Sequence, residues 1–425
     1  MLSQTKTMWF DPQLRAKSEE LRILVNQLAS TLLKHETASG LRKRARKDAD
    51  RKSFCVAIEA LACNLILLKA TGNDAKLAVP RSHSFLWQGS ASANPVYGQH
   101  FLTAIGLMAS LGLIAEARRG YRISAKSRMP SLIGPTDDLA QHLPLTPPDW
   151  RGVQQIDDPV LIILKEGKDE DGHAAAIAFF ETAQTRKFAN QVQRINKLLR
   201  EADIQITGQD TGLCLGKDGH IVAPYRRSLR RIFNNGTWQH GGRLAGGYWM
   251  SMERAERRRI RIDGERIANV DYRQLFPRLA YVRAGEAQPE SDIYDVAGDG
   301  TGRDGWKKLM NAMLFSGRPL KSWPEDTRQH FPGTKLRTAI EMLEMRHAPI
   351  KHLFGAGLGF QLMRIESDML IEVITYLAQA GVTALPLHDA VLVAKSKADI
   401  AARAMQAVFA RGTGSACAIV STTFL

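Results

Sequence analysis

Residues 269–275 read Asn-Val-Asp-Tyr-Arg-Gln-Leu and predict the end of a β-strand that carries an aspartate. Apolar and polar residues partly alternate from residue 259 to residue 270, as they do in a strand with one buried face. Apolar residues at helical spacing follow Asp271, so a helix is expected after the strand. This order places the Asp271 carboxylate at the edge of a sheet.

A second aspartate lies far downstream in a similar setting. Residues 385–393 read Leu-Pro-Leu-His-Asp-Ala-Val-Leu-Val. This apolar run is too short for a buried helix and predicts a hairpin of two buried strands with Asp389 inside it. Two aspartates brought side by side can hold two divalent cations, the arrangement used for in-line attack on a phosphate. Either aspartate alone would more often be a cap or turn residue.

The composition is that of a soluble globular protein with room for two or three domains. The chain has 425 residues, of which 44% are hydrophobic, and no apolar run approaches the length of a membrane span. The first ten residues lack an export-signal layout, so a cytoplasmic protein is expected. The cysteines lack CxxC spacing, which predicts free thiols rather than a zinc ribbon or disulfides. They are Cys55, Cys63, Cys214 and Cys417.

The charge points to a polyanionic partner. Lysine and arginine total 58 against 43 aspartate and glutamate residues, a net charge of +15. Nucleic acid is the commonest partner of a globular protein this basic, although a basic protein without such a partner is the alternative.

The N-terminal 150 residues are expected to form a mostly helical domain that binds nucleic acid. The segment 1–52 looks helical and ends in a basic run at 41–47, which is either a solvated face or a phosphate-contacting arm. A core helix is expected over 54–69. A helix over 98–111 is followed by a strand, an Arg118-Arg119-Gly turn and a second strand, an order that resembles a winged helix with a basic wing. A structural helix and hairpin without DNA contacts is the alternative.

A proline-rich segment, 130–150, marks the predicted domain boundary. Beyond it the sequence predicts a short strand over 160–164 and helices over 174–182 and 189–201. In residues 225–233 arginines alternate with apolar and aromatic residues, which suits a bound nucleic-acid strand, with an exposed basic helix face as the alternative. The arginines concerned are Arg226, Arg227, Arg230 and Arg231.

Four short motifs follow one another in the C-terminal half. They are Gly-Gly-Arg-Leu at 241–244, the stretch 270–278, a helix-like stretch at 303–317, and His-Asp-Ala at 388–390. From residue 238 onward the chain resembles the polymerase core of family A DNA polymerases and the related single-subunit phage RNA polymerases. It is most similar to a short phage- and plasmid-type branch that lacks the editing exonuclease domain.

The resemblance implies roles for individual residues. Asp271 and Asp389 would bind two Mg²⁺ or Mn²⁺ ions, and the carbonyl group of Tyr272 would complete a coordination sphere. His388 would touch the primer terminus, and Arg243 would reach the primer–template backbone, with the glycines before it allowing the close approach. The alternative role of His388 is that of a core histidine.

The third motif implies a nucleotide-binding helix. Arg303 and a lysine one turn later would share a helix face and grip the triphosphate, with Lys307 favoured over Lys308 as that lysine. Phe315 stands where the family has a tyrosine, and Phe276 where it has the glutamate that helps to exclude the ribose 2′-hydroxyl. These two departures leave the choice of sugar open, with DNA synthesis favoured.

The resemblance implies an α/β (α+β) fold with a right-hand polymerase in its C-terminal part. The palm would comprise 236–291 and 361–425, the fingers 292–360, and a helical thumb-like region 151–235, after the N-terminal domain of 1–150. The function implied is template-directed addition of dNTPs or NTPs to a primer on a DNA template, without proofreading, in a phage or mobile element. The polymerase core would thus span 151–425.

Two other functions are compatible with the sequence. One is a non-catalytic DNA-binding replication initiator or regulator on a polymerase-like scaffold, and the other is a single-subunit RNA polymerase or primase. A template-independent terminal transferase is a weaker option. Retention of both aspartates together with Arg303 and Lys307 argues against the non-catalytic alternative, because binding alone needs no carboxylates facing phosphate.

Overall fold

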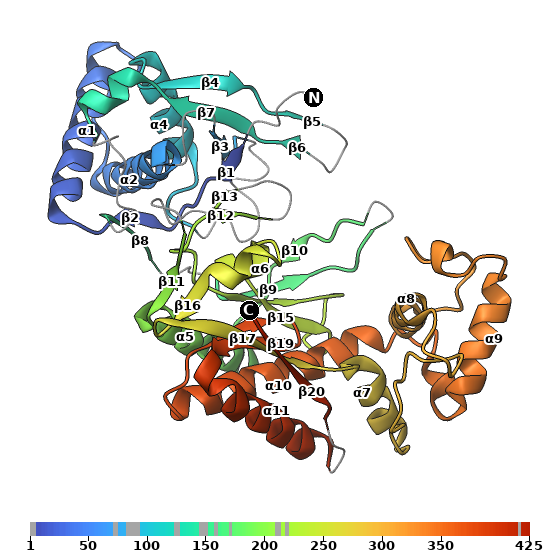
Figure 1. Ribbon diagram of the computed structural model, residues 1–425. Coiled ribbons are helices and arrows are strands. Elements are labelled where there is room, and N and C mark those ends of the chain that lie inside the picture. Colours follow the sequence, from blue (N-terminus) through green and yellow to red (C-terminus); the bar gives the residue numbers. More distant parts are fainter. Residues whose placement is uncertain are drawn as a thin grey trace.

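The computed structural model shows a mixed α/β protein, as the sequence predicts (Figure 1). It describes residues 6–70, 75–81, 94–122, 128–143, 152–156, 160–169, 172–208, 214–216, 221–414 and 418–425. No helix in these residues is long and apolar enough to cross a membrane. The thiols of Cys55 and Cys63 are free, as expected, and Cys417 lies outside the described residues.

The N-terminal region combines helices with a four-stranded sheet in the order β1-β3-β7-β4. Its elements are β1 (Thr7–Trp9), β2 (Leu14–Ala16), α1 (Glu19–Ala38), α2 (Asp48–Ala70), β3 (Lys76–Val79), α4 (Gln99–Ser110), β4 (Ile114–Arg118), β5 (Tyr121–Arg122), β6 (Arg128–Met129), β7 (Ser131–Pro135) and a 3-10 helix (Asp137–Gln141). Helix α2 contains the expected core helix: Phe54, Leu61 and Leu65 are fully buried. Because α2 is apolar on most of its faces, it forms the centre of this core.

The predicted Arg118-Arg119-Gly turn is wrong. Strand β4 pairs with β7, and β5 pairs with β6, so the chain stays extended through these residues. The backbone N–H of Gly120 donates to the Ser131 side chain, and the register shifts between Glu116 and Arg118. The Arg-Arg-Gly string is therefore an irregularity within a long hairpin. The residues that join β5 to β6 lie outside the described part of the chain.

The middle region, 151–235, was expected to be helical, and that expectation is wrong. Its described residues contain one long helix and several strands: β8 (Val153–Gln155), β9 (Ile162–Lys165), β10 (Ala176–Ile177), α5 (Ala183–Glu201), β11 (Ile204–Ile206), β12 (Cys214–Leu215), β13 (Ile221–Val222) and β14 (Arg230–Phe233). The expected helix over 174–182 is β10 and coil, because a Thr182 capping box starts α5 at residue 183. The expected strand at 160–164 and helix at 189–201 correspond to β9 and α5.

The C-terminal region holds a six-stranded sheet in the order β11-β16-β17-β19-β18, with β20 also paired to β17. Its elements are β15 (Gly241–Ala245), α6 (Tyr248–Ser251), a 3-10 helix (Glu256–Arg259), β16 (Ile260–Ile262), β17 (Glu265–Tyr272), α7 (Leu275–Ala284), α8 (Arg303–Phe315), α9 (Leu336–Arg346), α10 (Gly359–Gln379), β18 (Ala384–Leu387), β19 (Ala390–Ala394), α11 (Ala398–Thr413) and β20 (Val420–Phe424). Short 3-10 helices span Arg328–His330, Ala348–Leu353 and Lys395–Lys397.

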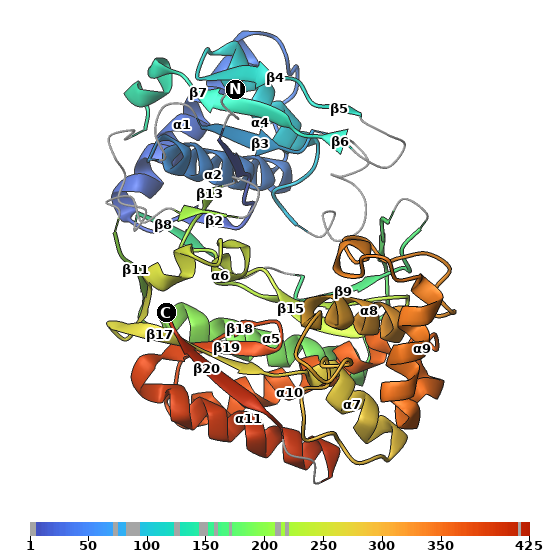
Figure 2. The ribbon, with the colours of Figure 1, turned by 45° about the vertical axis from the view of Figure 1, so that its right-hand side comes forward.

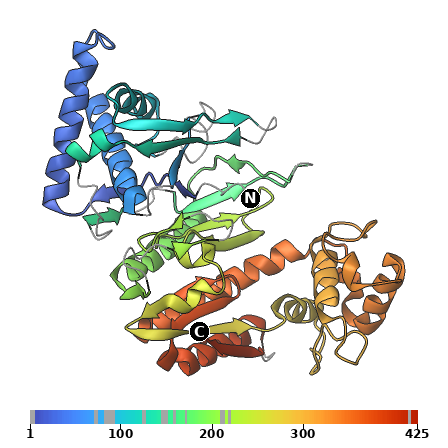
Figure 3. The ribbon, with the colours of Figure 1, turned by 45° about the horizontal axis from the view of Figure 1, so that its top comes forward.

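Helices α10 and α11 cover one face of this sheet, while α8 and α9 stand to one side of it (Figures 2 and 3). Strands β18 and β19 are buried along their whole length, which explains their continuous apolar sequence. A second large core forms around β17, β19 and α10, separate from the core around α2 and α4. A small third cluster joins Phe188 of α5 to Phe233 of β14.

The buried carboxylate of Asp11 joins the N-terminal region to the rest of the chain through hydrogen bonds. One oxygen of this group accepts hydrogen bonds from Arg226 Nε at 3.2 Å and from Gln155 Nε2 at 2.9 Å. The Asp11 backbone N–H donates to Asn64 of α2 at 2.8 Å. Arg226, one of the four arginines at 225–233, is thereby used to join two parts of the fold.

Candidate active site

The two aspartates of the sequence prediction are brought to neighbouring strands at the same end of the sheet. Asp271, the penultimate residue of β17, pairs in register with Ala390, the first residue of β19. Asp389 directly precedes Ala390 in the two-residue turn between β18 and β19. The Tyr272 backbone N–H donates to the Asp389 carbonyl oxygen at 3.3 Å. The expected hairpin and strand end are both found.

The other residue of this turn, His388, has a strained backbone. Its φ is +59°, in the left-handed region that residues other than glycine seldom adopt. The side chain is exposed, which rules out the alternative of a core histidine. A strained turn held between two buried strands fixes the direction of the adjacent Asp389 side chain.

The carboxylate pair is electrostatically unusual. Burial, and then repulsion from Asp389, raises the pKa of Asp271 to about 7, and Lys307 opposes this rise. Its Oδ1 atom is buried without a hydrogen-bond partner in the described structure. A buried, unsatisfied carboxylate oxygen beside a second carboxylate fits a hard divalent cation.

The described residues contain no larger group of metal-binding side chains. No group of three or more His, Cys, Asp or Glu side chains that would hold a metal occurs among the described residues. The pair itself remains suitable for Mg²⁺, because this ion commonly takes one or two carboxylates together with water and substrate phosphates.

We expect Asp271→Asn to stabilise the metal-free protein. The folded-state pKa of about 7 exceeds the unfolded value of 3.8, so folding binds a proton in this window and stability falls as the pH rises through it. Asparagine does not ionise. The unfolding free energy of the variant should therefore exceed that of the wild type by ~1–3 kcal/mol near pH 8 and by less near pH 5. Urea denaturation in EDTA at both pH values measures it. An equal gain at the two pH values would contradict the assignment.

An ion pair between Arg243 of β15 and Glu366 of α10 borders the carboxylates. Arg243 Nε and Nη2 donate to the two Glu366 oxygens at 2.7 and 2.6 Å. Burial is the main cause that raises the pKa of Glu366 to about 7, against the lowering effect of Arg243. Both groups interact electrostatically with Asp389, so they belong to the same cluster.

The glycines of β15 allow this strand to pack closely against α10. Gly241 and Gly242 have φ values of +77° and +78°, and a Cβ atom on Gly242 would lie 3.2 Å from the Arg364 side chain of α10. The Gly242 carbonyl oxygen accepts hydrogen bonds from Arg231 and Ser367. The glycines therefore allow β15 to approach α10 closely, which differs from the predicted approach to a primer–template backbone.

Helix α8 presents its two lysines to different surroundings. Lys307 is exposed and interacts electrostatically with Asp271. Lys308 Nζ donates instead to the Asp326 carbonyl oxygen at 2.9 Å. Arg303, at the start of the helix, is held by Asp292 through a hydrogen bond of 2.7 Å. Of the two lysines considered, Lys307 is the one beside the carboxylate pair.

Aromatic rings line the side of the site between α7, α8 and α10. The ring centroids of Phe276 and Phe315 lie 5.5 Å apart, and those of Phe315 and Phe360 lie 5.3 Å apart. The Arg243 guanidinium lies 5.5 Å from the Phe276 ring centroid. Tyr272 points away from this row, because its hydroxyl group donates to the Met405 carbonyl oxygen in the core. The Tyr272 side chain is therefore structural.

The arginines predicted to bind nucleic acid at 225–233 are largely occupied by the fold. Arg231 is fully buried, pairs with Asp368 and packs against the stacked rings of Phe188 and Phe233, so the prediction for it is wrong. Arg227 donates to the carbonyl oxygens of Leu199, Ala202 and Ile204, and thereby caps the end of α5. Arg227 is half-buried, so its contact with nucleic acid stays a prediction. Arg230, on β14, is half-buried.

The two arginines of the predicted wing lie in the N-terminal region, remote in the fold from β17 and β19. Arg118 is half-buried, with its guanidinium 5.8 Å from the Tyr121 ring centroid. Arg119 is exposed and lines a cavity of about 810 Å³ together with Trp9 and Tyr121. This cavity does not border the carboxylate pair.

Sequence reasoning missed two acidic residues of the site. They are Glu366 of α10 and Asp292 of the loop between α7 and α8. Asp292 accepts hydrogen bonds from Gln274, Arg303 and the Tyr294 backbone, and so joins the loop before α8 to the end of β17. For Glu366 the signal was a charge on the apolar face of α10, which predicts a buried partner.

Comparisons with known proteins give a weak structural match. No protein-family model and no curated protein matches the sequence. Among solved structures, the chain is similar to the POL domain of Pol1 from M. smegmatis in complex with DNA primer-template and dNTP, with a TM-score of 0.31 and 13% identity. The match covers 56% of this chain and 51% of that one, so it spans about half of the polymerase domain.

Proposed function

We propose that this chain is a template-directed nucleotidyltransferase that adds nucleotides to the 3′-end of a primer on a DNA template, with dNTPs as the favoured substrates. The observation that carries the proposal is the carboxylate pair of Asp271 and Asp389 on adjacent strands, with one buried Asp271 oxygen left unsatisfied. Pairs of carboxylates at a strand end suit phosphoryl chemistry, because they hold the cations that neutralise phosphate charge.

The residues around the pair divide into three roles. Asp271 and Asp389 would hold two Mg²⁺ or Mn²⁺ ions, which when bound neutralise charge on the phosphates and favour the deprotonated 3′-hydroxyl. Lys307 would offset the charge of the leaving pyrophosphate. Arg303 is already oriented by Asp292 and would contact the same phosphates. The 3′-oxygen would bond to the α-phosphorus as the bond to pyrophosphate breaks.

The architecture supports a division of the C-terminal part into palm and fingers. The sheet with β17 and β19, backed by α10 and α11, would be the palm, and α8 and α9 beside it would be the fingers. The proposed thumb over 151–235 lacks the helical character expected of one, since α5 is the one long helix that is described there. The rings of Phe276 and Phe315 would form an apolar wall near the sugar of the nucleotide.

The two lysines of α8 give a matched pair of variants. We expect Lys307→Ala to raise the KM for the nucleotide roughly tenfold to a hundredfold, because it removes a cation that faces the phosphates. Lys308→Ala removes the same charge one residue away and should change the KM by about twofold at most, because that lysine bonds to Asp326. Steady-state kinetics with varied nucleotide measures both values. A larger effect at Lys308 would reverse the assignment.

Extension of a labelled primer on a DNA template tests the proposed function. The wild-type protein would be supplied with dNTPs or with NTPs, in Mg²⁺ and separately in Mn²⁺. Extension that follows the template sequence supports the proposal, and the nucleotide used identifies a DNA polymerase or an RNA polymerase or primase. Homopolymer addition to an unpaired primer would indicate a terminal transferase. Tight DNA binding without extension would favour a non-catalytic initiator or regulator.

A further inference from the structure

The basic run at 41–47 forms the loop between α1 and α2, at the end of α1 that lies opposite to β2 (Figures 1 and 3). The loop borders a cavity of about 580 Å³. The cavity is lined by basic side chains and one acidic side chain. The basic ones come from the last turns of α1, from the loop and from the first turn of α2. The charged lining residues are Lys34, Glu36, Arg42, Arg44, Arg46 and Arg51.

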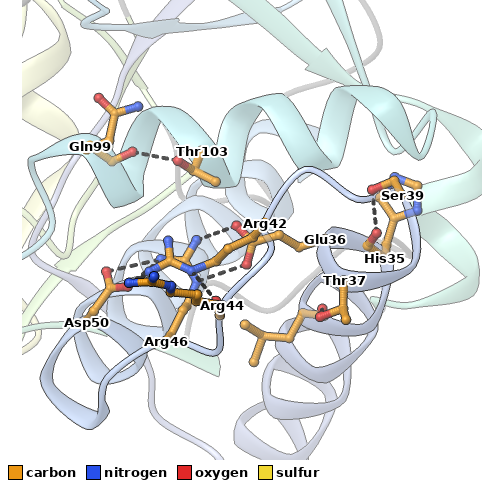
Figure 4. A network of polar contacts seen from close by, with 11 residues as sticks. His35, Glu36, Thr37, Ser39, Arg42, Arg44, Arg46, Asp50, Gln99 and Thr103 are labelled. Carbon is orange, nitrogen blue, oxygen red and sulfur yellow. Dashed lines mark hydrogen bonds and ion pairs between the residues drawn. The ribbon is translucent and has the colours of Figure 1, made fainter.

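A buried arginine fixes the shape of this loop (Figure 4). The side chain of Arg46 is only 4% exposed. It donates to both Glu36 oxygens, at 3.0 and 2.7 Å, and to both Asp50 oxygens, at 3.0 Å. Its guanidinium also lies 4.1 Å from the Phe54 ring centroid in the core. These contacts tie the loop to α1 and α2, so its other side chains project from a defined backbone.

A second arginine strengthens this frame. Arg42 Nη2 donates to Asp50 at 2.9 Å, and its Nε donates to the Arg44 carbonyl oxygen at 3.0 Å. The carboxylates of Glu36 and Asp50 are therefore used by Arg42 and Arg46. They do not neutralise the remaining cations around the cavity.

Three exposed cations are left over. The side chains of Lys34, Arg44 and Arg51 have no ion pair with any residue that the structure describes. They come from α1, from the loop and from α2, and all three line the same cavity. A loop that is held by buried ion pairs and presents exposed, unpaired cations at one cavity is suited to the phosphates of a polyanion.

We propose that this cavity and its rim bind the phosphate groups of a nucleic-acid backbone. Arg44 and Arg51 would contact phosphates directly, since guanidinium groups bind phosphate oxygens with two hydrogen bonds. Lys34 would add a third charge beside them. The site lies on the N-terminal region, apart from Asp271 and Asp389, so it would hold a part of the nucleic acid other than the reacting end. Such binding does not depend on polymerase activity.

A nucleic-acid strand fits this site better than a small anion does. The cavity is open enough for its cations to stand on the rim, and each is exposed to solvent. The net charge of +15 on the whole chain would bring a polyanion to the surface.

The salt dependence of DNA binding by the full-length protein tests this proposal. Affinity for a short labelled duplex would be measured by fluorescence anisotropy between about 50 and 200 mM salt. The variant Arg44→Ala/Arg51→Ala should bind roughly tenfold more weakly near 100 mM salt, and the slope of log affinity against log salt should fall by about 1.8. This change in slope follows from the loss of two phosphate contacts, at about 0.9 for each contact.

Two matched variants separate the site from general charge. Lys17→Ala/Lys52→Ala removes two exposed cations of the same region that do not line the cavity, and it should keep the wild-type slope. Arg44→Lys/Arg51→Lys keeps the charges and should retain most of that slope. Thermal melting shows whether each variant is folded.

Two results would overturn the proposal. One is a wild-type slope and affinity in a folded Arg44→Ala/Arg51→Ala protein. The other is an equal loss in the Lys17→Ala/Lys52→Ala control. Failure of primer extension would leave this test unaffected, because binding is measured without nucleotides, so the failure of one proposal can be told from the failure of the other.

Discussion

Asp389→Ala is expected to abolish primer extension, with a loss on the order of 10³-fold or more in the rate. Asp389 supplies one of the two carboxylates at the end of β17 and β19. The remaining Asp271 carboxylate, alone and largely buried, would hold one cation weakly and two not at all. Alanine keeps the two-residue turn, because the strand pairing on both sides of it involves backbone atoms.

A matched control distinguishes loss of chemistry from loss of structure. Asp399 is an exposed aspartate in the first turn of α11, and Asp399→Ala removes one carboxylate outside the site. This variant should extend primers like the wild type. Both variants should melt near the wild-type temperature and bind primer–template DNA. Extension by Asp389→Ala within tenfold of the wild type would contradict the assignment of the pair.

The prediction also separates the candidate functions. A non-catalytic DNA-binding protein would show no extension in the wild type, and Asp389→Ala would change nothing that can be measured except metal binding. A polymerase of either sugar preference would lose activity with Asp389→Ala. Stabilisation of the wild type by Mg²⁺ or Mn²⁺, absent in the variant, would show that the pair holds a cation even if no substrate were accepted.

The sequence predicted those parts of the site that depend on local patterns. The strand end at Asp271 and the hairpin around Asp389 were both expected from short apolar runs and turn residues, and both are found. Continuous burial of β18 and β19 explains why the apolar run there has no alternation. The order of the motifs predicts that these segments share one site, and the pairing of β17 with β19 brings them together.

Long-range pairing was beyond sequence reasoning. The arginines at 225–233 have the composition of a nucleic-acid contact, yet Arg231 meets Asp368 and Arg227 caps α5, partners that no local pattern reveals. The same holds for β4, whose partner β7 follows only after β5 and β6. Charged residues near aromatic ones are typical of nucleic-acid surfaces and of buried ion pairs alike. The difference lies in burial, which depends on the tertiary fold.

The ion pair of Arg243 and Glu366 was missed for this reason. Substitution of Arg243 is expected to have the second large effect. Glu366 is 1% exposed and bonds to Arg243 through both oxygens. Arg243→Ala should destabilise the protein by about 3 kcal/mol or more near pH 8, because it leaves a carboxylate without a counterion in the interior. The surviving Glu366 would then relieve part of this cost by taking up a proton.

This uptake gives the effect of Arg243→Ala a defined pH dependence. In the wild type, the folded-state pKa of Glu366 is about 7 and the ordinary value is 4.5, so its contribution to stability already falls as the pH rises between these values. Arg243 lowers that pKa, so the pKa in the variant lies higher and the loss continues above pH 7. The destabilisation by Arg243→Ala should therefore be larger near pH 8 than near pH 6.

A double-mutant cycle with Glu366→Gln isolates the pair. Glutamine has nearly the same shape and carries no charge, so Arg243→Ala/Glu366→Gln should be more stable near pH 8 than Arg243→Ala alone, with a coupling energy of about 2 kcal/mol or more. Urea denaturation of the four proteins at about pH 6 and pH 8 measures it. Additive effects at both pH values would mean that the two groups do not interact. A coupling that grows with pH would show that Glu366 and Arg243 form an ion pair in the folded protein, in which the Arg243 guanidinium also interacts electrostatically with Asp389.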